Sequence, residues 1–284
     1  MNRNRQGKRI SFDLSATEFY HAVVLELTAA REKEVRALLS PHSRKKSSKL
    51  LVEGTRAVAT MLATGVTPDY VICCPTLLTA AGKKFLADHQ GAIVYECGAK
   101  RFSSFSETEH SQGILAVADR EALPAGEPFW PRAKFVLYLD GLADPGNLGT
   151  ILRTAAAFNV DLVALSPGSA DLYSPKVLRA SAGEVFLQPT IRRISPETLL
   201  GKLKSNSIAL YGADADARVR LDELVPSGKV CLAIGSEATG LSDSLRKACD
   251  KVFAIRTSSR IESLNAAVAA AIAMSQFASA LKTV

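Results

Sequence analysis

The sequence is poor in the features that mark secreted and membrane proteins. Its five cysteines are an odd number, and no two of them stand at the two-residue spacing of a zinc knuckle or a redox pair. The longest apolar run, residues 266–273, is too short to span a bilayer, and the basic N-terminus lacks the apolar core of a signal peptide. We therefore expect a cytoplasmic protein with free thiols, without a metal site and without a membrane role.

The sequence also lacks the loops that identify the commonest nucleotide-binding enzymes and hydrolases. It contains no G-x-G-x-x-G dinucleotide fingerprint, no G-x-x-x-x-G-K-[ST] phosphate loop and no G-x-S-x-G nucleophile elbow. An oxidoreductase that uses a nicotinamide cofactor is therefore disfavoured. The four histidines lie outside the strand junctions described below, so any chemistry there has to use Arg, Asn, Glu and Ser side chains.

The composition favours a globular protein, and the charge favours a polyanionic partner. Of the 284 residues, 47% are hydrophobic and 22% are charged, which is enough to bury a core and favours two domains. The net charge is +7, with basic clusters at residues 3–9 and 44–49. Charge alone does not decide between a polyanion site and a solvated surface.

A linker rich in proline divides the chain. Three prolines and a glycine fall within residues 121–132, so we place the linker at residues 120–132. Residues 28–119 are expected to form a small α/β sandwich, and residues 133–284 a second α/β domain with a mostly parallel sheet. Residues 1–27 match neither pattern and are left unassigned.

The alternation of apolar runs with helical patterns predicts the elements of both domains. In the first domain we expect helices at residues 55–63 and 77–89 and strands at residues 49–53, 70–74, 92–96 and 114–118. In the second domain we expect strands at residues 135–140, 160–166, 208–213, 230–235 and 252–255, and an alanine-rich last helix at about 262–281.

Parallel sheets bind ligands at the carboxyl ends of their strands, so the junctions after these strands are the candidate sites. The first junction continues into DPGNLGTILRTA, where we expect Asn147 to cap a helix that runs to about Asn159. Arg153 lies off the apolar stripe of that helix, on a line with Gly149. A surface arginine in such a place is usually only solvated, so spacing alone does not assign it a function.

The second junction, IGSEATGLSD, carries a carboxylate between glycines. Gly235 and Gly240 flank Glu237, and glycines there would let a ligand approach the backbone closely. A turn followed by a helix capped by Ser242 would explain the glycines and the serine. It would leave the carboxylate unexplained.

The third junction, ESLN, lies at the start of the last predicted helix and contains Ser263, Leu264 and Asn265. A capping box formed by Ser259 with Glu262 would account for polar residues here equally well. None of the three junctions is specific by itself.

Taken together and in this order, DPGNLGTILRTA, SPKVLRASAG, IGSEATGLSD and ESLNAAVA resemble the signature motifs of the TrmH/SpoU-type methyltransferases of the SPOUT superfamily. Upstream, SRKKSSKLLVEGTRAV and HSQGILAVA resemble the substrate-binding domain of the same family, which has a ribosomal-protein-like α/β/α fold. The resemblance covers residues 28–284.

The resemblance implies an RNA 2′-O-ribose methyltransferase that uses S-adenosylmethionine. It also implies a C-terminal SPOUT α/β domain with a deep trefoil knot, and a homodimer built through that domain. The residues that match the family's cofactor-binding positions are Ala213, Gly235, Ile255 and Leu264. The residues that match its polar active-site positions are Asn147, Arg153, Glu237, Ser263 and Asn265.

The chain departs from the family pattern after Ile255. The family often has Pro-Met and a glycine there, where this chain has Arg256 and Thr257 followed by residues 258–260. The departure leaves open the shape of the loop that covers the cofactor.

The chemistry of methyl transfer divides the work among these residues. Alignment of the hydroxyl behind the methyl group can supply roughly 7 to 11 kcal/mol. A general base typically accelerates a reaction about 100- to 10,000-fold, which corresponds to about 3 to 5 kcal/mol, so alignment should contribute more. Arginine is a very poor base, so we expect Arg153 to clamp phosphate or ribose. Asn147, Ser263 and Asn265 would orient the hydroxyl. Glu237 would brace an arginine, of its own chain or across the dimer, rather than act as the base.

The basic segment of the first domain is expected to hold the RNA backbone. The target is transfer or ribosomal RNA, and no DNA is expected. Two rival functions fit the same motifs: an RNA-binding protein of this fold without catalysis, and a methyltransferase that protects ribosomal RNA from an antibiotic. The complete set of active-site residues disfavours a loss of catalysis. The basic residues in question are Arg44, Lys45, Lys46 and Lys49.

Overall fold

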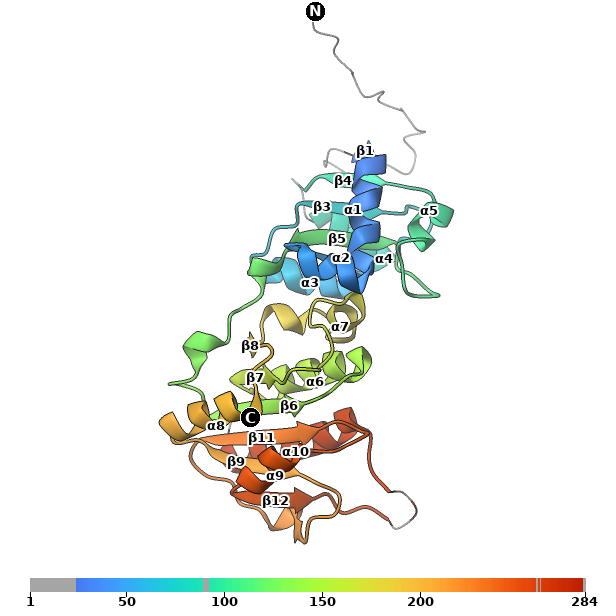
Figure 1. Ribbon diagram of the computed structural model, residues 1–284. Coiled ribbons are helices and arrows are strands. Elements are labelled where there is room, and N and C mark those ends of the chain that lie inside the picture. Colours follow the sequence, from blue (N-terminus) through green and yellow to red (C-terminus); the bar gives the residue numbers. More distant parts are fainter. Residues whose placement is uncertain (1–23, 89–91, 259, 261, 283–284) are drawn as a thin grey trace, which may run out of the picture. The chain divides into compact units, whose positions relative to one another are not determined.

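The computed structural model describes residues 24–88, 92–258, 260 and 262–282 (Figure 1). The chain forms two compact units: the N-terminal unit contains residues up to 59 together with 67–119, and the C-terminal unit contains residues 60–66 together with those from 120 onward. Most of the unassigned extension lies outside the described residues, and so does its basic cluster. Among the described residues, no helix is both long and apolar enough to cross a membrane.

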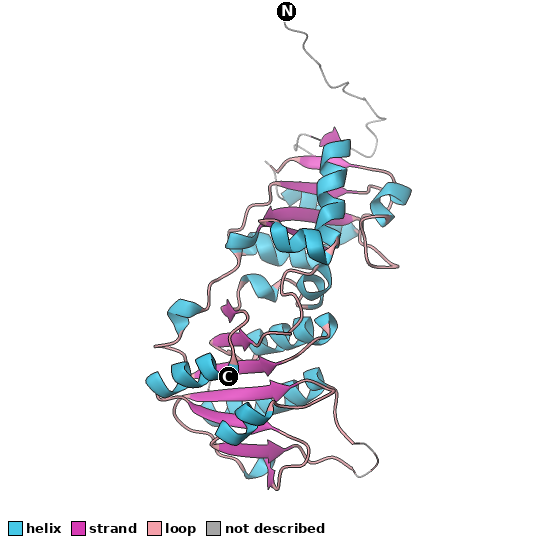
Figure 2. Cartoon of the chain, viewed as in Figure 1, coloured by secondary structure: helices cyan, strands magenta, loops and turns pink. Residues whose placement is uncertain are grey.

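The N-terminal unit is a five-stranded mixed sheet with helices (Figure 2). Its strands are β1 (Val24–Glu26), β2 (Lys49–Glu53), β3 (Tyr70–Cys73), β4 (Val94–Glu96) and β5 (Ile114–Asp119). Its helices are α1 (Ala29–Leu39), α2 (Pro41–Lys46), α3 (Thr55–Ala63), α4 (Ala80–Asp88) and α5 (Ala99–Ser103). In the order β1-β4-β3-β5-β2, the first three strands run parallel, and β5 runs antiparallel to β3 and β2.

The apolar runs predicted the larger elements of this unit and missed the small ones. The four predicted strands are confirmed to within two residues, and the helix at residues 55–63 is confirmed at both ends. Helix α1 was missed because only Val35 and Leu38 are buried in it, so its sequence shows almost no apolar stripe. The other missed elements, β1, α2 and α5, are too short to show a period.

The C-terminal unit is a seven-stranded sheet with helices packed against it. Its strands are β6 (Phe135–Asp140), β7 (Leu162–Leu165), β8 (Thr190–Ile191), β9 (Ala209–Ala213), β10 (Val219–Arg220), β11 (Val230–Gly235) and β12 (Lys251–Ala254). Its helices are α6 (Pro145–Ala157), α7 (Pro175–Ala180), α8 (Pro196–Ser205), α9 (Asp243–Ala248) and α10 (Ala266–Leu281). Short 3-10 turns are η2 (Arg120–Ala122), η3 (Glu127–Phe129), η4 (Glu184–Phe186) and η5 (Leu221–Glu223).

Every neighbouring pair of strands in this sheet runs parallel, in the order β10-β12-β9-β11-β6-β7-β8. The predicted parallel sheet is therefore confirmed. Because the carboxyl ends share one edge, the loops after β9, β11 and β12 open toward the same place. The two-residue strands β8 and β10 were not predicted. The deep trefoil knot implied by the resemblance stays a prediction.

Aromatic packing fixes α10 against this sheet. The ring of Phe277 lies 6.0 Å from that of Phe135, 5.2 Å from that of Tyr211 and 5.9 Å from that of Phe253, measured between centroids. The three partners belong to β6, β9 and β12, and Phe135, Phe253 and Phe277 are fully buried. The helix is thus anchored to the strands whose ends form the candidate site.

The starts of α6 and α10 differ from the prediction. Asp144, not Asn147, caps α6: its carboxylate accepts a hydrogen bond of 2.7 Å from the Asn147 N–H, and a proline occupies the first helical position. Helix α6 ends at Ala157, slightly earlier than expected. Helix α10 begins at Ala266 with Asn265 as its cap, about one turn later than predicted, so the residues before Asn265 lie in a loop.

Helices α6 and α7 pack against each other at a glycine. A Cβ atom added to Gly149 would lie 2.5 Å from the Ala180 Cβ and 2.8 Å from the Val177 carbonyl oxygen. Real Cβ atoms do not approach other atoms so closely, so this contact requires glycine. The SPKVLRASAG motif therefore has a structural role, because it forms α7 and the residues that meet α6.

The substitution Gly149→Ala should push α6 and α7 apart and lower the free energy of unfolding by about 1 to 3 kcal/mol, as overpacking does. Gly201→Ala in α8 is the matched control, because nothing lies within 4 Å of the added methyl group. That control should stabilise the protein by about 0.5 to 1 kcal/mol. Denaturant unfolding measures both, and equal effects would contradict the close packing at Gly149.

Candidate active site

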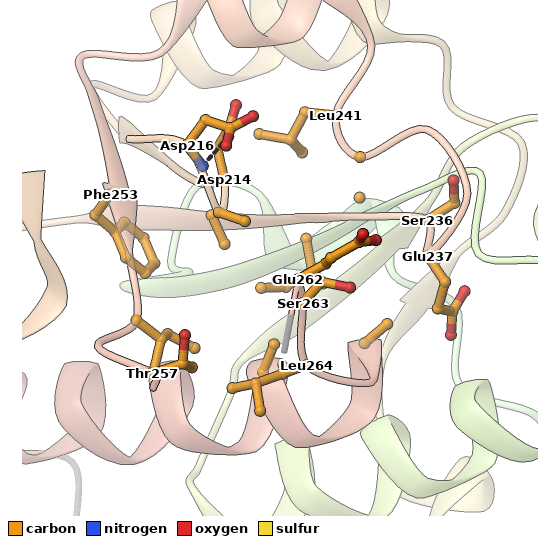
Figure 3. A pocket seen from close by; sticks show the side chains of 18 of the residues that line it. Asp214, Asp216, Ser236, Glu237, Leu241, Phe253, Thr257, Glu262, Ser263 and Leu264 are labelled. Atoms are coloured by element: carbon orange, nitrogen blue, oxygen red, sulfur yellow. Dashed lines mark hydrogen bonds between the residues drawn. The ribbon is translucent and has the colours of Figure 1, made fainter. Parts of the chain in front are cut away.

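The carboxyl edge of the C-terminal sheet holds a cavity of about 850 Å³ (Figure 3). Residues from three strand ends line it: 213–216 at the end of β9, 234–237 and 239–241 at the end of β11, and 255–258 with 262–264 after β12. In Figure 3 the aspartates after β9 lie on one side of the cavity and Glu237 on the other. The lining includes all the residues that match the family's cofactor positions, namely Ala213, Gly235, Ile255 and Leu264.

The loop after β11 folds back on itself. The Gly240 N–H donates to the Ser236 carbonyl at 3.0 Å, and the Ser236 N–H donates to the Gly240 carbonyl at 3.2 Å. A Cβ atom at Gly235 would overlap the backbone of Gly240 and Leu241, and Gly240 has a φ of +65°. The chain reversal in this loop therefore requires both glycines, whether or not a ligand approaches the backbone.

The end of this loop is tied to the neighbouring strand. Asp140, the last residue of β6, accepts a hydrogen bond of 2.8 Å from the Ser242 N–H. Ser242 holds the predicted cap position of α9, although its side chain makes no capping hydrogen bond. The loop that carries Glu237 is therefore held at both ends.

Carboxylates outnumber guanidinium groups in the lining of the cavity. Arg246 forms an ion pair of 2.5 Å with Asp214, and Arg256 pairs with Asp222 and Glu223, which lie outside the lining. Such a lining favours a ligand with positive charge. The lining carboxylates are Asp214, Asp216, Glu237, Asp243 and Glu262, and the guanidinium groups belong to Arg220, Arg246 and Arg256.

Two asparagines and a glutamate form a chain of hydrogen bonds that ends at the cavity. The Asn265 Nδ2 donates to the Asn147 Oδ1 at 3.1 Å, and the Asn147 Nδ2 donates to the Glu237 Oε1. The Asn265 Oδ1 accepts from the backbone N–H groups of Ala267 and Val268 at 2.9 and 3.3 Å, which caps α10. The fold thus joins one residue from each of the three junctions. Glu237 accepts from an asparagine of its own chain, and its role as a brace for an arginine stays a prediction.

Ser263 and Arg153 stand apart from this chain of hydrogen bonds. Ser263 is exposed and lines the cavity. Arg153 is exposed on α6, outside the lining, and has no hydrogen bond or ion pair to the part of the chain that the structure describes. Of the alternative capping box, Ser259 lies outside the described residues, and Asn265 caps the helix instead.

Several charged residues of the cavity were not predicted from the sequence. Asp214 directly follows β9, so the rule that pointed to the other strand ends could have found it. Arg246 lies on α9 and reaches the cavity only through the fold, so no sequence pattern marks it.

The cysteines of this unit do not supply a nucleophile. Burial raises the pKa of Cys231, and burial together with the nearby Asp250 raises the pKa of Cys249 to about 11. Both therefore remain protonated thiols near neutral pH.

The predicted RNA-binding residues of the N-terminal unit divide into two pairs. Arg44 is buried and donates to the Leu38 and Leu39 carbonyls at 2.9 and 3.1 Å, which closes the end of α1. Lys49 forms ion pairs of 2.7 Å with Asp69 and 2.9 Å with Asp119, and these carboxylates raise its pKa. Both side chains serve the fold. Lys45 and Lys46, at the end of α2, are exposed.

Two family models match the chain. The model of the SpoU rRNA methylase family matches residues 134–275, which include every predicted active-site and cofactor residue. The model of the MRM3-like substrate binding domain matches residues 30–116.

Relatives and solved structures match nearly the whole chain. The 23S rRNA (guanosine(2553)-2′-O)-methyltransferase RlmP of Bacillus subtilis (strain 168) is 31% identical over 251 residues, which are 87% of this chain and 96% of the relative. A crystal structure of an RNA 2′-O ribose methyltransferase superposes with a TM-score of 0.77 at 27% identity, covering 92% of this chain and 100% of that one. An AdoMet-bound rRNA methyltransferase from Sinorhizobium meliloti superposes with a TM-score of 0.76 at 25% identity, covering 89% and 97%.

Two substitutions at Asn265 should separate its capping role from its amide contact. Asn265→Ala removes the acceptor that caps α10 and should lower the free energy of unfolding by about 0.5 to 2 kcal/mol. Asn265→Asp keeps an acceptor, and its charge is favourable at a helix N-terminus, so the loss should be smaller than about 0.5 kcal/mol. Denaturant unfolding measures both variants. Equal losses would mean that the side chain does not stabilise the helix as a cap.

Proposed function

The chain belongs to the SpoU rRNA methylase family, and we propose that it transfers a methyl group from S-adenosylmethionine to a ribose 2′-hydroxyl of transfer or ribosomal RNA. The observation that carries this proposal is the chain of hydrogen bonds from Asn265 through Asn147 to Glu237, which ends at the cavity. The cavity provides a place for the methyl donor, and the amides beside it provide polar groups for the acceptor. Its enzyme class is that of an RNA 2′-O-ribose methyltransferase.

The residues around the cavity fit S-adenosylmethionine. The volume of about 850 Å³ falls within the roughly 300 to 1,000 Å³ of small-molecule sites. The excess of carboxylates suits a ligand that carries a sulfonium and an ammonium group. Backbone groups of Ala213, Gly235, Ile255 and Leu264 would hold the cofactor, which supplies an activated methyl group when it is bound.

Asn147 is placed to receive the ribose hydroxyl. An asparagine amide has two N–H donors and two acceptor lone pairs. Asn147 gives one donor to Glu237 and one lone pair to Asn265, so one of each remains. Because both neighbours fix the plane of the amide, the remaining groups have a set direction, which is what alignment of a reacting hydroxyl requires. Ser263 adds a hydroxyl group in the lining of the same cavity.

Arg153 serves as a clamp for the RNA and not as a base. Its guanidinium group is exposed and has no partner among the described residues, so its five N–H donors are available to a phosphate or a ribose. A guanidinium group stays protonated in proteins and is therefore a very poor proton acceptor. Its contribution is therefore to hold the substrate in register.

The N-terminal unit holds the RNA, as a substrate-binding domain. The match of residues 30–116 to the MRM3-like substrate binding domain supports this role. Of the four predicted basic residues, Lys45 and Lys46 present their charges to solvent, whereas Arg44 and Lys49 are engaged in the fold. Contacts to the RNA backbone from this unit would therefore come from Lys45 and Lys46 first.

The functional protein is a homodimer assembled through its C-terminal unit. Val268 and Ile272 of α10 are 48% and 40% exposed, and their spacing places them on one line of the helix. Exposed apolar side chains on one helix face favour burial against a second copy. The C-terminal unit would also contain the trefoil knot that the resemblance implies.

A cytoplasmic location agrees with an RNA substrate and with five free thiols.

Incubation of the purified protein with S-adenosylmethionine and RNA, followed by mass spectrometry of the nucleosides, tests the proposed function. The expected product is a 2′-O-methylated nucleoside. A calorimetric titration with S-adenosylmethionine separates the enzyme from a pure RNA-binding protein. The proposal would be overturned if the protein bound S-adenosylmethionine but transferred no methyl group to a ribose of either transfer RNA or ribosomal RNA.

Arg153→Lys should reduce the single-turnover rate of methyl transfer at saturating RNA by about 10- to 100-fold, because an ammonium group cannot make the bidentate contact of a guanidinium group. Arg218→Lys, at an exposed arginine of the same unit, is the control and should leave the rate unchanged. Near-full activity of Arg153→Lys would contradict the clamp.

Replacing Lys45 and Lys46 together by glutamine should weaken RNA binding and reduce the slope of log Kd against log salt by about one for each lysine. The matched control replaces Lys83 and Lys84 by glutamine, because these two consecutive lysines are exposed on α4 of the same unit. Affinity for S-adenosylmethionine should stay unchanged in both double variants. An unaltered salt slope for the Lys45 and Lys46 variant would place the RNA elsewhere.

A further inference from the structure

Arg256 is the first residue at which the chain departs from its family pattern, and it forms ion pairs beside the cavity. Its Nε lies 3.0 and 3.2 Å from the two carboxylate oxygens of Asp222, and its Nη2 lies 3.1 Å from the Glu223 Oε1. The second oxygen of Glu223 accepts a hydrogen bond of 3.2 Å from the Arg220 N–H. One guanidinium group is therefore held by two consecutive carboxylates of η5.

These ion pairs extend the pairing of two parallel strands beyond the strand ends. Strands β10 and β12 run side by side, with Arg220 opposite Ala254. Arg256 lies two residues beyond Ala254, and Asp222 lies two residues beyond Arg220, so the side chains join the segments at the point where backbone pairing stops.

The joined segments form part of the wall of the cavity. Residues 255–258 and Arg220 line the cavity, whereas Asp222 and Glu223 stand outside the lining. Arg256 thus links the loop after β12 to the two carboxylates of η5, which lie outside the cavity lining. Without this tie, residues 255–258 would depend on their own backbone, which contains no proline to restrain it.

We propose that Arg256 is a positioning residue for the cofactor, because its ion pairs with Asp222 and Glu223 hold residues 255–258 in the shape that grips S-adenosylmethionine. The inference rests on the proposed use of this cavity by S-adenosylmethionine. Arg256 touches neither the reacting oxygen nor the methyl group in this account; it acts through the backbone of its own loop.

The exposure of the ion pairs predicts the size and the salt dependence of the effect. The side chains of Arg256, Asp222 and Glu223 are 62%, 61% and 54% exposed. Exposed ion pairs are weak and are screened by salt, so their loss should weaken cofactor binding by about two- to fivefold at low ionic strength. At about 1 M salt, where the screening length falls to about 3 Å, the difference should vanish.

The sign of the effect separates positioning from simple electrostatics. Arg256 is a cation beside a cavity for a cationic ligand, so removal of its charge alone would strengthen binding. S-adenosylmethionine also carries a carboxylate, but its net charge is positive, so weaker binding after removal points to the loop and not to the overall charge. Arg260 provides the matched control, because it is an exposed arginine in the same loop with no partner among the described residues.

The experiment is a calorimetric titration of S-adenosylmethionine into the full-length protein and into Arg256→Met, Arg256→Lys and Arg260→Met, at low and high salt. Arg256→Met should bind about two- to fivefold more weakly at low salt and like the parent protein at high salt. Arg256→Lys, which keeps the charge, should recover part of the loss. Arg260→Met should bind at least as tightly as the parent protein. Thermal unfolding of each variant provides the check that the fold is kept.

Two results overturn the inference in different ways. If the parent protein binds the cofactor and Arg256→Met binds equally well or better at low salt, the positioning role is wrong and the proposed function stands. If the parent protein does not bind S-adenosylmethionine, both fail.

Discussion

The parallel direction of all seven strands in the C-terminal sheet is the constraint on which the site depends. A parallel sheet sends every strand end to one edge, so segments that are distant in the sequence meet there. Glu237 lies 90 positions from Asn147 and reaches it because β11 pairs with β6 in register, with Gly235 opposite Asp140. The packing of α10 on the same sheet then brings Asn265 to the same place.

The two halves of the proposed reaction use different parts of the molecule. The backbone around the cavity would carry the donor, and the return of its loop after β11 requires Gly235 and Gly240. Side-chain amides would carry the acceptor, and their direction depends on a chain of hydrogen bonds that also caps a helix. Hydrogen bonds shared with helix capping attach these side chains to a regular element of the fold, which restrains their direction.

Much of the fold could be predicted from the sequence, because long buried strands leave a strong local signal. The run FVLYLD of β6 is buried at every position, and its strand is the one that the sequence predicts. The two-residue strands β8 and β10 leave no such signal. The cap of α6 was misassigned because both Asp144 and Asn147 are residue types that cap helices, and local propensity does not choose between them.

The partners of charged side chains were the least predictable feature. Arg44 and Lys49 belong to one basic run, yet one caps a helix and the other pairs with Asp69 and Asp119, which lie far along the chain. Only the tertiary fold shows that Arg44 and Lys49 are not among the exposed charges. The same holds for Arg246, which enters the cavity from a short helix.

The strand ends of the C-terminal sheet are proposed to hold the methyl donor. Hydrogen–deuterium exchange with and without S-adenosylmethionine tests it most directly, because exchange slows where a ligand orders or covers the backbone. We expect slower exchange at residues 213–216, 234–241 and 255–258, and no change in the sheet of the N-terminal unit. Protection confined to the N-terminal unit, or none at saturating cofactor, would contradict it.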